Sequence, residues 1–291
     1  MSREQNKVWT IRDIILWGEN YFATKKVEAP RLSIELLLCN LLEMSRLDLY
    51  LNYELPLCAI ELQTLKSQIR RLLKGEPLQY ILGWTQFLQY KILLNKKVFI
   101  PRPETEYMVN FIINKLKSQQ TQEMKILDIG CGSGAISVAL ADFFKKASVL
   151  AIDIDTNALL QTEENAKLHN LDNIKTMNLD ILKQIPKETF DLIVSNPPYI
   201  SLQEYKRLPR NVLKEPSISL TDNADGFSFF RCFASIFPKI LSNVGSFFLE
   251  VGWDQADEVE KIFTEKAFPV NIEKDFQGIK RIVYSIRFLN S

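Results

Sequence analysis

The chain has 291 residues, which is enough for one large domain or for a small domain beside a medium-sized one. With 46% hydrophobic and 24% charged residues, its composition is typical of a soluble globular protein with a substantial core. The 36 lysines and arginines almost cancel the 35 aspartates and glutamates. The resulting net charge of +1 weighs against a dedicated DNA-binding protein, whose surface is usually basic.

The cysteines and the hydropathy pattern favour a cytoplasmic protein. Cys39, Cys58, Cys131 and Cys232 lie far apart without a C-x-x-C pair, so neither a zinc site nor a disulfide framework is expected. The first residues lack the apolar core and cleavage site of a signal peptide. No apolar run approaches the roughly 18 residues that a membrane span requires, so no membrane partner is expected.

The first quarter of the chain is predicted to be helical. Apolar residues recur at helical spacing from residue 7 to about residue 74. One helix is expected to begin just after Pro30, and Pro56 is expected to open a third helix. Gly75 and Pro77 are expected to end that helix.

A short hairpin is predicted next. The segment QFLQYKILLNKKVFI, residues 86–100, is rich in β-branched and aromatic residues, and Asn-Lys-Lys at 95–97 is the turn candidate. The motif PRPETE, residues 101–106, follows and leads into a helix that extends through Lys117.

Strands then alternate with helices, which predicts a mostly parallel sheet covered by helices on both faces. Ligands of such sheets bind outside the carboxyl ends of the strands, so the residues at the strand ends are the candidate site. The expected strands are residues 125–129, 148–152, 174–178, 190–194, 245–251, 269–273 and 281–286.

The first strand ends in the glycine-rich segment DIGCGSG, residues 128–134. Glycines let the backbone turn sharply and approach a ligand, and the following helix N-terminus offers free N–H groups. With Ala135 the segment also fits the loose dinucleotide pattern G-x-G-x-x-A, so a nicotinamide-binding oxidoreductase is one alternative. Asp128 would repel a pyrophosphate, and it better suits a cationic ligand such as S-adenosylmethionine.

Acidic residues follow the second and third strands. Asp153 is placed to accept hydrogen bonds from ribose hydroxyls, whereas Asp155 is expected to cap the next helix. At the third strand end, Asp180 and Ile181 could meet the edge and the face of an adenine.

The fourth strand, FDLIV, ends in SNPPYI, residues 195–200. Prolines make this turn rigid and remove N–H donors, so the turn presents acceptors. Asn196 Oδ1 and the Pro197 carbonyl can both accept from a planar –NH2 group, and Tyr199 can supply an aromatic wall. Such a clamp would aim the nitrogen of an amide or of an exocyclic amine at an electrophilic methyl group.

Together, DIGCGSGA, AIDID and SNPPYI resemble the class I S-adenosylmethionine-dependent methyltransferases that act on planar nitrogen. That group includes DNA adenine-N6, rRNA guanine-N2 and protein glutamine methyltransferases. APRLSIELLLCNLLEMSRLDLYL, GEPLQYILG, VFIPRPETEYMV, KEPSISLTDNADGF, LEVGWDQADEV and DFQGIKRIVYS resemble, in order, blocks of the peptide chain release factor glutamine methyltransferases of the PrmC/HemK type. The resemblance covers almost the full length.

The resemblance implies an α/β fold, a Rossmann-like class I methyltransferase domain preceded by a small helical domain and a short β-hairpin. Its expected boundaries are a helical substrate-recognition domain at residues 1–83, a hairpin linker at 84–101 and the methyltransferase domain at 102–291. The implied reaction is direct methyl transfer from S-adenosyl-L-methionine to the side-chain amide nitrogen of the glutamine in the GGQ motif of class I release factors, which tunes translation termination. No direct nucleic-acid substrate is expected.

The resemblance also assigns roles to residues of this chain. Asn196, Pro197 and Tyr199 are the implied catalytic residues, and Pro198 joins them in binding the substrate. Arg102 and Glu104 are placed near the active site without a chemical step. The implied cofactor-binding residues are Gly130, Cys131, Gly132, Ser133, Gly134, Asp153, Asp180, Ile181 and Asn196.

Two departures from the family pattern and three alternatives accompany this interpretation. Cys131 replaces a threonine that is common in the glycine loop, and KEPSISL carries serines where the family is more apolar. The closest functional alternatives are an adenine-N6 DNA methyltransferase and a glutamine methyltransferase of a ribosomal protein. A catalytically inactive interaction protein is the third, and the intact loops argue against it. The single histidine, His169, is expected to have a surface or capping role.

Overall fold

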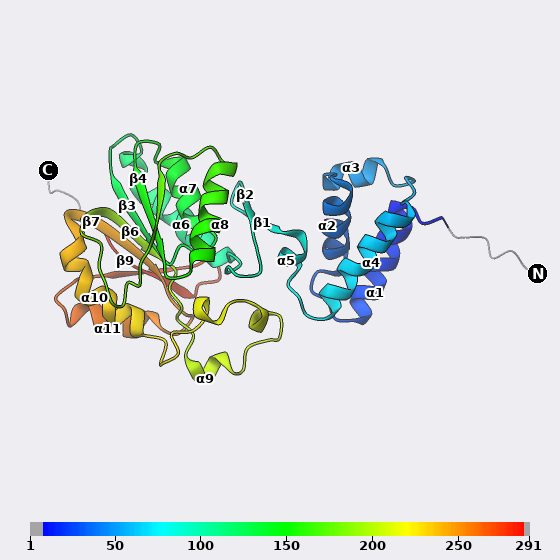
Figure 1. Ribbon diagram of the computed structural model, residues 1–291. Coiled ribbons are helices and arrows are strands. Elements are labelled where there is room, and N and C mark those ends of the chain that lie inside the picture. Colours follow the sequence, from blue (N-terminus) through cyan, green and yellow to red (C-terminus); the bar gives the residue numbers. More distant parts are fainter. Residues whose placement is uncertain (1–7, 288–291) are drawn as a thin grey trace, which may run out of the picture. The chain divides into compact units, whose positions relative to one another are not determined.

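The computed structural model describes residues 8–287, so residues 1–7 and 288–291, where the predicted domains begin and end, lie outside the described residues. The chain divides into two compact units between Gly83 and Trp84. The first unit is helical and the second contains the large sheet (Figure 1). No helix in the described part of the chain combines the length and the apolar character needed to cross a membrane.

The helical unit contains a buried apolar cluster to which Ile11, Ile15, Phe22, Ile34 and Leu38 belong. Two short helices, at residues 46–51 and 78–82, were not predicted. The five helices are α1 (Ile11–Thr24), α2 (Pro30–Leu42), α3 (Arg46–Leu51), α4 (Ala59–Leu73) and α5 (Leu78–Leu82).

The prediction that Pro56 opens a helix is wrong, because α4 begins at Ala59. The backbone around Pro56 is extended and pairs with the segment before α1. Leu57 N donates to Trp9 O at 2.9 Å, and Ile11 N donates to Leu55 O at 3.0 Å. These bonds occupy backbone groups that a helix would have needed.

The hairpin forms, but its turn is not at the predicted place. Strands β1 (Trp84–Phe87) and β2 (Tyr90–Leu93) are antiparallel and are joined at Leu88 and Gln89, where Leu88 has a φ of 52°. Asn95 does form a local turn, in which its Oδ1 accepts from Lys97 N at 2.8 Å, but this turn follows the hairpin.

The second unit has a seven-stranded sheet in the order β5-β4-β3-β6-β7-β9-β8. Strand β9 runs antiparallel to the other six strands, which are parallel to one another, so the predicted fold class is confirmed. Helices α6, α7 and α8 pack in one layer, and α10 and α11 pack together on the other face (Figure 1). The strands are β3 (Lys125–Ile129), β4 (Ser148–Asp153), β5 (Ile174–Asn178), β6 (Phe190–Ser195), β7 (Leu241–Glu250), β8 (Asn271–Lys274) and β9 (Lys280–Ser285). The α-helices are α6 (Pro103–Leu116), α7 (Ala135–Phe143), α8 (Thr156–Leu168), α9 (Leu202–Tyr205), α10 (Ser228–Ile240) and α11 (Ala256–Thr264).

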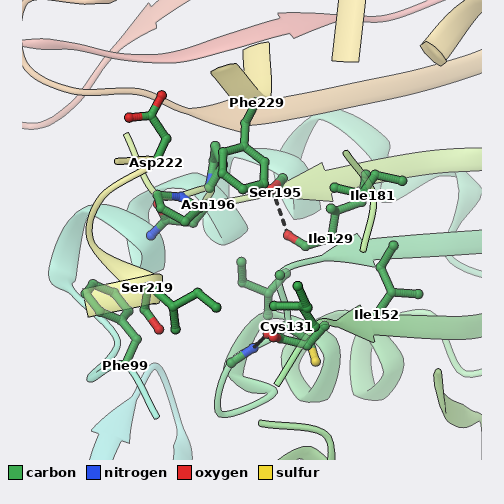
Figure 2. A pocket seen from close by; sticks show the side chains of 18 of the residues that line it. Phe99, Ile129, Cys131, Ile152, Ile181, Ser195, Asn196, Ser219, Asp222 and Phe229 are labelled. Carbon is green, nitrogen blue, oxygen red and sulfur yellow. Dashed lines mark hydrogen bonds between the residues drawn. The ribbon is translucent and has the colours of Figure 1, made fainter. Parts of the chain in front are cut away.

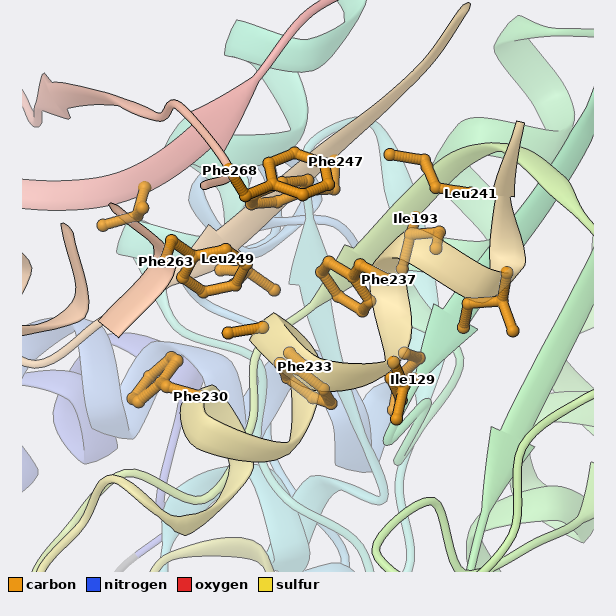
Figure 3. Packing of buried hydrophobic residues seen from close by; sticks show 14 of the residues in the cluster. Ile129, Ile193, Phe230, Phe233, Phe237, Leu241, Phe247, Leu249, Phe263 and Phe268 are labelled. Atoms are coloured by element: carbon orange, nitrogen blue, oxygen red, sulfur yellow. The ribbon is translucent and has the colours of Figure 1, made fainter. Parts of the chain in front are cut away.

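Phenylalanines fill the core between the sheet and the layer of α10 and α11 (Figure 3). The rings of Phe233 and Phe237 in α10 are stacked with centroids 5.1 Å apart, and Phe237 lies 5.0 Å from Phe247 of β7. Phe247 in turn stacks on Phe263 of α11 at 5.0 Å. This packing fixes β7, which ends in Glu250, a residue that contacts Thr105 and Tyr199 of the site described below.

The register of the parallel strands aligns their carboxyl ends along one edge. Ile129 of β3 pairs with Ile152 of β4 on one side and with Ser195 of β6 on the other. Ser195 pairs with Leu249 of β7, so Asn196 and Glu250 leave the sheet side by side. The strand ends that the sequence singled out therefore meet, as expected for a parallel sheet.

Candidate active site

A pocket opens at this edge, between the segments that follow β3, β4, β5 and β6 (Figure 2). It brings together most of the predicted site residues. Gly134 and Tyr199 are the two that do not line it. The predicted residues in its wall are Gly130, Cys131, Gly132, Ser133, Asp153, Asp180, Ile181, Asn196, Pro197 and Pro198.

The glycine loop presents bare backbone to this pocket. Gly130 and Gly132 have φ values of +74° and +55°, and a Cβ added to either would meet no atom within 4 Å. Gly134 differs, because a Cβ added there would lie 2.9 Å from Thr162 Cα. The structure thus places Gly134 in the packing of α7 on α8, where a side chain would separate the two helices.

Asp153 is held rigidly at the end of β4. Its Oδ2 accepts from Gly132 N at 3.0 Å, and its Oδ1 accepts from Asp155 N at 2.9 Å. Burial raises its pKa despite these bonds. Each carboxylate oxygen keeps a second lone pair, so Asp153 can still accept from hydroxyl groups of a ligand. Asp155 caps α8 by accepting from Asn157 N at 2.9 Å, as predicted.

Asp128 lies beneath the glycine loop and outside the pocket wall. Its side chain is fully buried, and its Oδ2 accepts from Ser137 Oγ at 2.6 Å. Its Oδ1 has no hydrogen-bond partner among residues 8–287. Burial raises the pKa of Asp128 to about 7. Asp128 therefore contacts α7 directly and could act on a cation in the pocket only through its charge.

Part of the wall of the first pocket is apolar. Ile129, Ile152, Ile181 and Phe229 lie around one end of it (Figure 2). At its rim, Asp180 accepts from Leu182 N at 3.1 Å and forms an ion pair with Lys183. Apolar side chains with a few convergent polar groups are typical of sites that bind a small molecule or a cofactor.

The NPPY segment begins directly after β6. Ser195 Oγ donates to Ile129 O at 2.7 Å, which fixes the end of β6 against β3 (Figure 2). Asn196 Nδ2 donates to Thr105 Oγ1 at 3.0 Å, and no bond to Asn196 Oδ1 is found in the described part of the chain. The Tyr199 carbonyl accepts from Gln255 Nε2 at 2.9 Å. The segment is thus anchored while one acceptor of Asn196 remains open.

A second cavity adjoins the first and shares Phe99, Asn196, Pro197 and Ser219 with it. Tyr199 and Arg102 line this second cavity, together with Ile200, Val212 and Leu220. Asn196 and Pro197 therefore belong to the wall of both cavities. Tyr199, for which an aromatic wall is predicted, lines the second cavity and not the first.

An ion pair supports this second cavity. Arg102 pairs with Glu215, which is buried and also accepts from Ile100 N at 3.2 Å. The Arg102 guanidinium lies 4.8 Å from the centroid of the Phe99 ring. Arg102 thus forms part of the wall of the second cavity. Glu104 lines neither cavity.

Two side chains that contact the NPPY segment, Thr105 and Glu250, were not predicted from the sequence. Thr105 lines the first cavity, and its Oγ1 donates to Glu250 Oε2 at 2.7 Å. Tyr199 Oη lies 3.4 Å from Glu250 Oε1. Burial raises the pKa of Glu250 to about 7. An acidic residue at the end of the fifth sheet strand could have been noticed by the same rule that identified Asp153.

His169, the single histidine, lines neither cavity. His169 Nε2 is 2.9 Å from the Lys91 carbonyl of the hairpin, so the ring contacts β2. Among residues 8–287, no group of three or more His, Cys, Asp or Glu side chains is arranged to hold a metal ion.

Two family models match the chain, the PrmC N-terminal domain over residues 13–83 and the methyltransferase small domain over residues 90–223. A release factor glutamine methyltransferase from Geobacter sulfurreducens is 34% identical over 282 residues, which cover 96% of this chain and 98% of that protein. The enzyme of the same name from Chlorobaculum tepidum is 34% identical and covers 95% of this chain and 97% of that protein.

A solved methyltransferase structure shares the fold of a large part of this chain. The 16S rRNA N2 G1207 methyltransferase of T. thermophilus, solved with AdoMet and guanosine, is 17% identical to this chain with a TM-score of 0.51. The match covers 70% of this chain and 50% of that one. At this level of identity the likeness concerns the fold.

Proposed function

The chain belongs to the release factor glutamine methyltransferase family, and from that premise we propose that it methylates class I peptide chain release factors. The proposed acceptor is the side-chain amide nitrogen of the glutamine in their GGQ motif, and the proposed methyl donor is S-adenosyl-L-methionine. This modification would tune translation termination. A cytoplasmic location and the absence of a direct nucleic-acid substrate are parts of the same proposal.

The observation that carries the proposal is the place of Asn196 and Pro197 in the wall that the two cavities share. A donor in the first cavity and a glutamine side chain entering through the second would meet at these two residues. Asn196 Oδ1 and the Pro197 carbonyl would accept the two amide protons and hold the nitrogen in line with the methyl group. Tyr199 would form the wall along the rest of the amide.

The residues of the first cavity fit the proposed donor. The bare backbone at Gly130 and Gly132 leaves room for a ligand to approach closely. Asp153 would hold ribose hydroxyls, and Ile181 with Asp180 would lie by the adenine. When bound, S-adenosyl-L-methionine supplies an electrophilic methyl group on a sulfonium. Ser133 and Cys131 complete the wall around it.

The chain's residues need not remove a proton before the methyl group is transferred. An amide nitrogen is a weak nucleophile because its lone pair is delocalised, so orientation by two acceptors is the main contribution of the site. The C–N bond would form as the methyl C–S bond breaks, and the amide proton would then leave to water. No residue is required to form a covalent intermediate.

A labelling experiment tests the proposal. The protein is incubated with S-adenosylmethionine labelled in its methyl group and with a release factor, a release factor whose GGQ glutamine is replaced by alanine, or DNA. We expect label on the intact release factor alone. Label on DNA, or equal label on the alanine variant, would overturn the proposal. Protection from thermal unfolding by S-adenosylmethionine and not by NAD separates the methyltransferase from an oxidoreductase.

A further inference from the structure

Three side chains from distant segments form a hydrogen-bonded series that runs from Asn196 through Thr105 to Glu250. Asn196 follows β6, Thr105 lies in the first turn of α6, and Glu250 ends β7. Asn196 Nδ2 donates to Thr105 Oγ1 at 3.0 Å, and Thr105 Oγ1 donates to Glu250 Oε2 at 2.7 Å. The packing of α6 against β7 creates this series.

The series is shielded from water at its inner end. Thr105 is 3% exposed and Glu250 is 1% exposed, whereas Asn196 is half-buried at the cavity wall. Glu250 also meets Tyr199 Oη, at 3.4 Å from its Oε1. Buried polar groups of this kind are costly unless each has a partner, so the bonds constrain one another.

The chemistry of the three groups sets the direction of the series. An ionised Glu250 can only accept, so the single hydroxyl proton of Thr105 must be donated to it. The Thr105 oxygen then has only lone pairs to offer to its other neighbour. Asn196 must therefore turn its –NH2 group toward Thr105, which leaves Oδ1 as its open acceptor.

We propose that Thr105 and Glu250 are positioning residues that fix the Asn196 amide with its carbonyl oxygen available to the substrate. This inference rests on the proposed function, because it explains how Asn196 keeps its Oδ1 atom, and not its –NH2 group, directed toward the –NH2 group of the substrate glutamine. If the side-chain amide of Asn196 were rotated by about 180°, its –NH2 group would face the –NH2 group of the substrate, so two donors would face each other. Neither Thr105 nor Glu250 needs to touch the substrate in this role.

A pair of variants at Thr105 tests the proposal. T105V keeps the shape of the side chain and removes the hydroxyl, so the Asn196 amide loses its orienting partner. We expect kcat on the release factor to fall by about 5- to 150-fold, the range for one unpaired buried hydrogen-bonding group. T105S retains the hydroxyl and should keep most of the wild-type kcat. Both variants should keep the circular dichroism spectrum and the cooperative thermal unfolding of the wild type, which show that they are folded.

Glu250 provides a second test, the pH dependence of kcat, which would not change if Glu250 had only a structural role. E250Q introduces a donor, so the direction of the series is no longer imposed. Protonation of Glu250 in the wild type does the same, and burial raises the pKa of this carboxyl to about 7. The charged and titratable groups facing it are Glu104, which favours the protonated form, Arg281, which opposes it, and Tyr199.

The ratio of wild-type kcat to E250Q kcat should therefore be larger at pH 8 than at pH 6. A ratio that is constant over this range would overturn the proposal, as would a T105V kcat close to wild type or equal impairment of T105V and T105S. These results differ from failure of the proposed function, which would show as a wild-type protein that does not label the release factor.

Discussion

Asn196 has one open acceptor, because its nitrogen is already bonded to Thr105. Replacing Asn196 by alanine removes that acceptor and leaves a substrate proton unpaired. The expected loss is roughly 1–3 kcal/mol, which corresponds to a kcat about 5- to 150-fold below wild type. Cofactor affinity should be less affected, because the glycine loop and Asp153 belong to other strand ends. Steady-state kinetics with a release factor and calorimetric titration with S-adenosylmethionine measure the two quantities.

The control for this substitution is Asn211→Ala. Asn211 is exposed and lies outside the lining of both cavities, so its replacement should leave kcat near wild type. If Asn196→Ala retained wild-type turnover, Asn196 would have no part in holding the substrate amide.

Asp128 makes the stability of the protein depend on pH. An unfolded chain loses this proton near pH 4, whereas burial raises the pKa of the folded carboxyl to about 7. Between these values the folded state holds the additional proton, so the free energy of unfolding falls as the pH rises. The loss approaches about 4 kcal/mol and is complete above about pH 7.

Asp128→Asn is neutral at every pH and should remove this dependence. We expect the variant, without cofactor, to raise the melting temperature relative to wild type more at pH 8 than at pH 5. Thermal unfolding followed by circular dichroism at both pH values measures the effect. Asp172→Asn, at an exposed position, is the control and should show no such difference. An equal change of melting temperature at both pH values would contradict the prediction for Asp128.

At the scale of elements, the central strands β3 and β6 were predicted from sequence because each is a mostly buried apolar run. KILDI and FDLIV became β3 and β6 almost residue for residue. Strand β7 is longer than predicted, since it continues across an irregularity where Gly245 passes close to the Phe190 carbonyl. The hairpin turn was misplaced because Leu88, a poor turn former, adopts a positive φ there and its carbonyl accepts from Gln86 Nε2.

Residues of the candidate site could be predicted where a polar residue directly follows a strand that is itself evident from the sequence. Asp153 and Asn196 were found in this way, and both line the first cavity. The contact of Thr105 with Glu250 was not predictable, because it joins residues 145 positions apart through the packing of α6 on β7. Likewise, nothing local to PRPETE shows that Glu215 will pair with Arg102.

Helix α8 connects the hairpin with the glycine loop through Asn165, which is fully buried. Asn165 Oδ1 accepts from Leu93 N at 2.7 Å. Its Nδ2 donates to Leu93 O at 3.0 Å and to Ser133 O at 2.9 Å. One side chain therefore completes the backbone bonding of β2 and fixes the loop that forms the cavity wall.

Asn165→Leu should lower both the free energy of unfolding and the affinity for S-adenosylmethionine. The substitution leaves Leu93 and Ser133 backbone groups unpaired, at a cost of about 2–4 kcal/mol in unfolding free energy. Urea denaturation and calorimetric titration measure the two effects. Gln161→Leu is the matched control, because Gln161 is a buried amide of the same helix that bonds Asn95 and Glu164 but not the loop. It should be less stable than wild type with nearly unchanged cofactor affinity, and the same loss of affinity in both variants would contradict the role of Asn165.

At the scale of the whole molecule, the chain consists of two units, each with its own buried apolar cluster. The helical unit has a buried cluster made of residues between Trp9 and Leu82. The sheet unit has its own cluster, drawn from residues between Leu127 and Val283. All residues that line the first cavity lie between Phe99 and Phe229, within the sheet unit. The parts needed to bind the proposed cofactor are therefore contained in one unit.

A truncated protein consisting of residues 84–291 tests this division. Because it retains its core and the entire lining of the first cavity, we expect it to fold and to bind S-adenosylmethionine with the affinity of the full chain. If the helical unit recognises the substrate, the truncated protein should label a release factor far more slowly than the full chain, because its KM for the release factor should be higher. Circular dichroism, calorimetric titration and labelling kinetics measure these three properties. Unchanged labelling kinetics would show that the helical unit does not serve substrate recognition, whereas a folded fragment with lost cofactor affinity would show that the first cavity depends on both units.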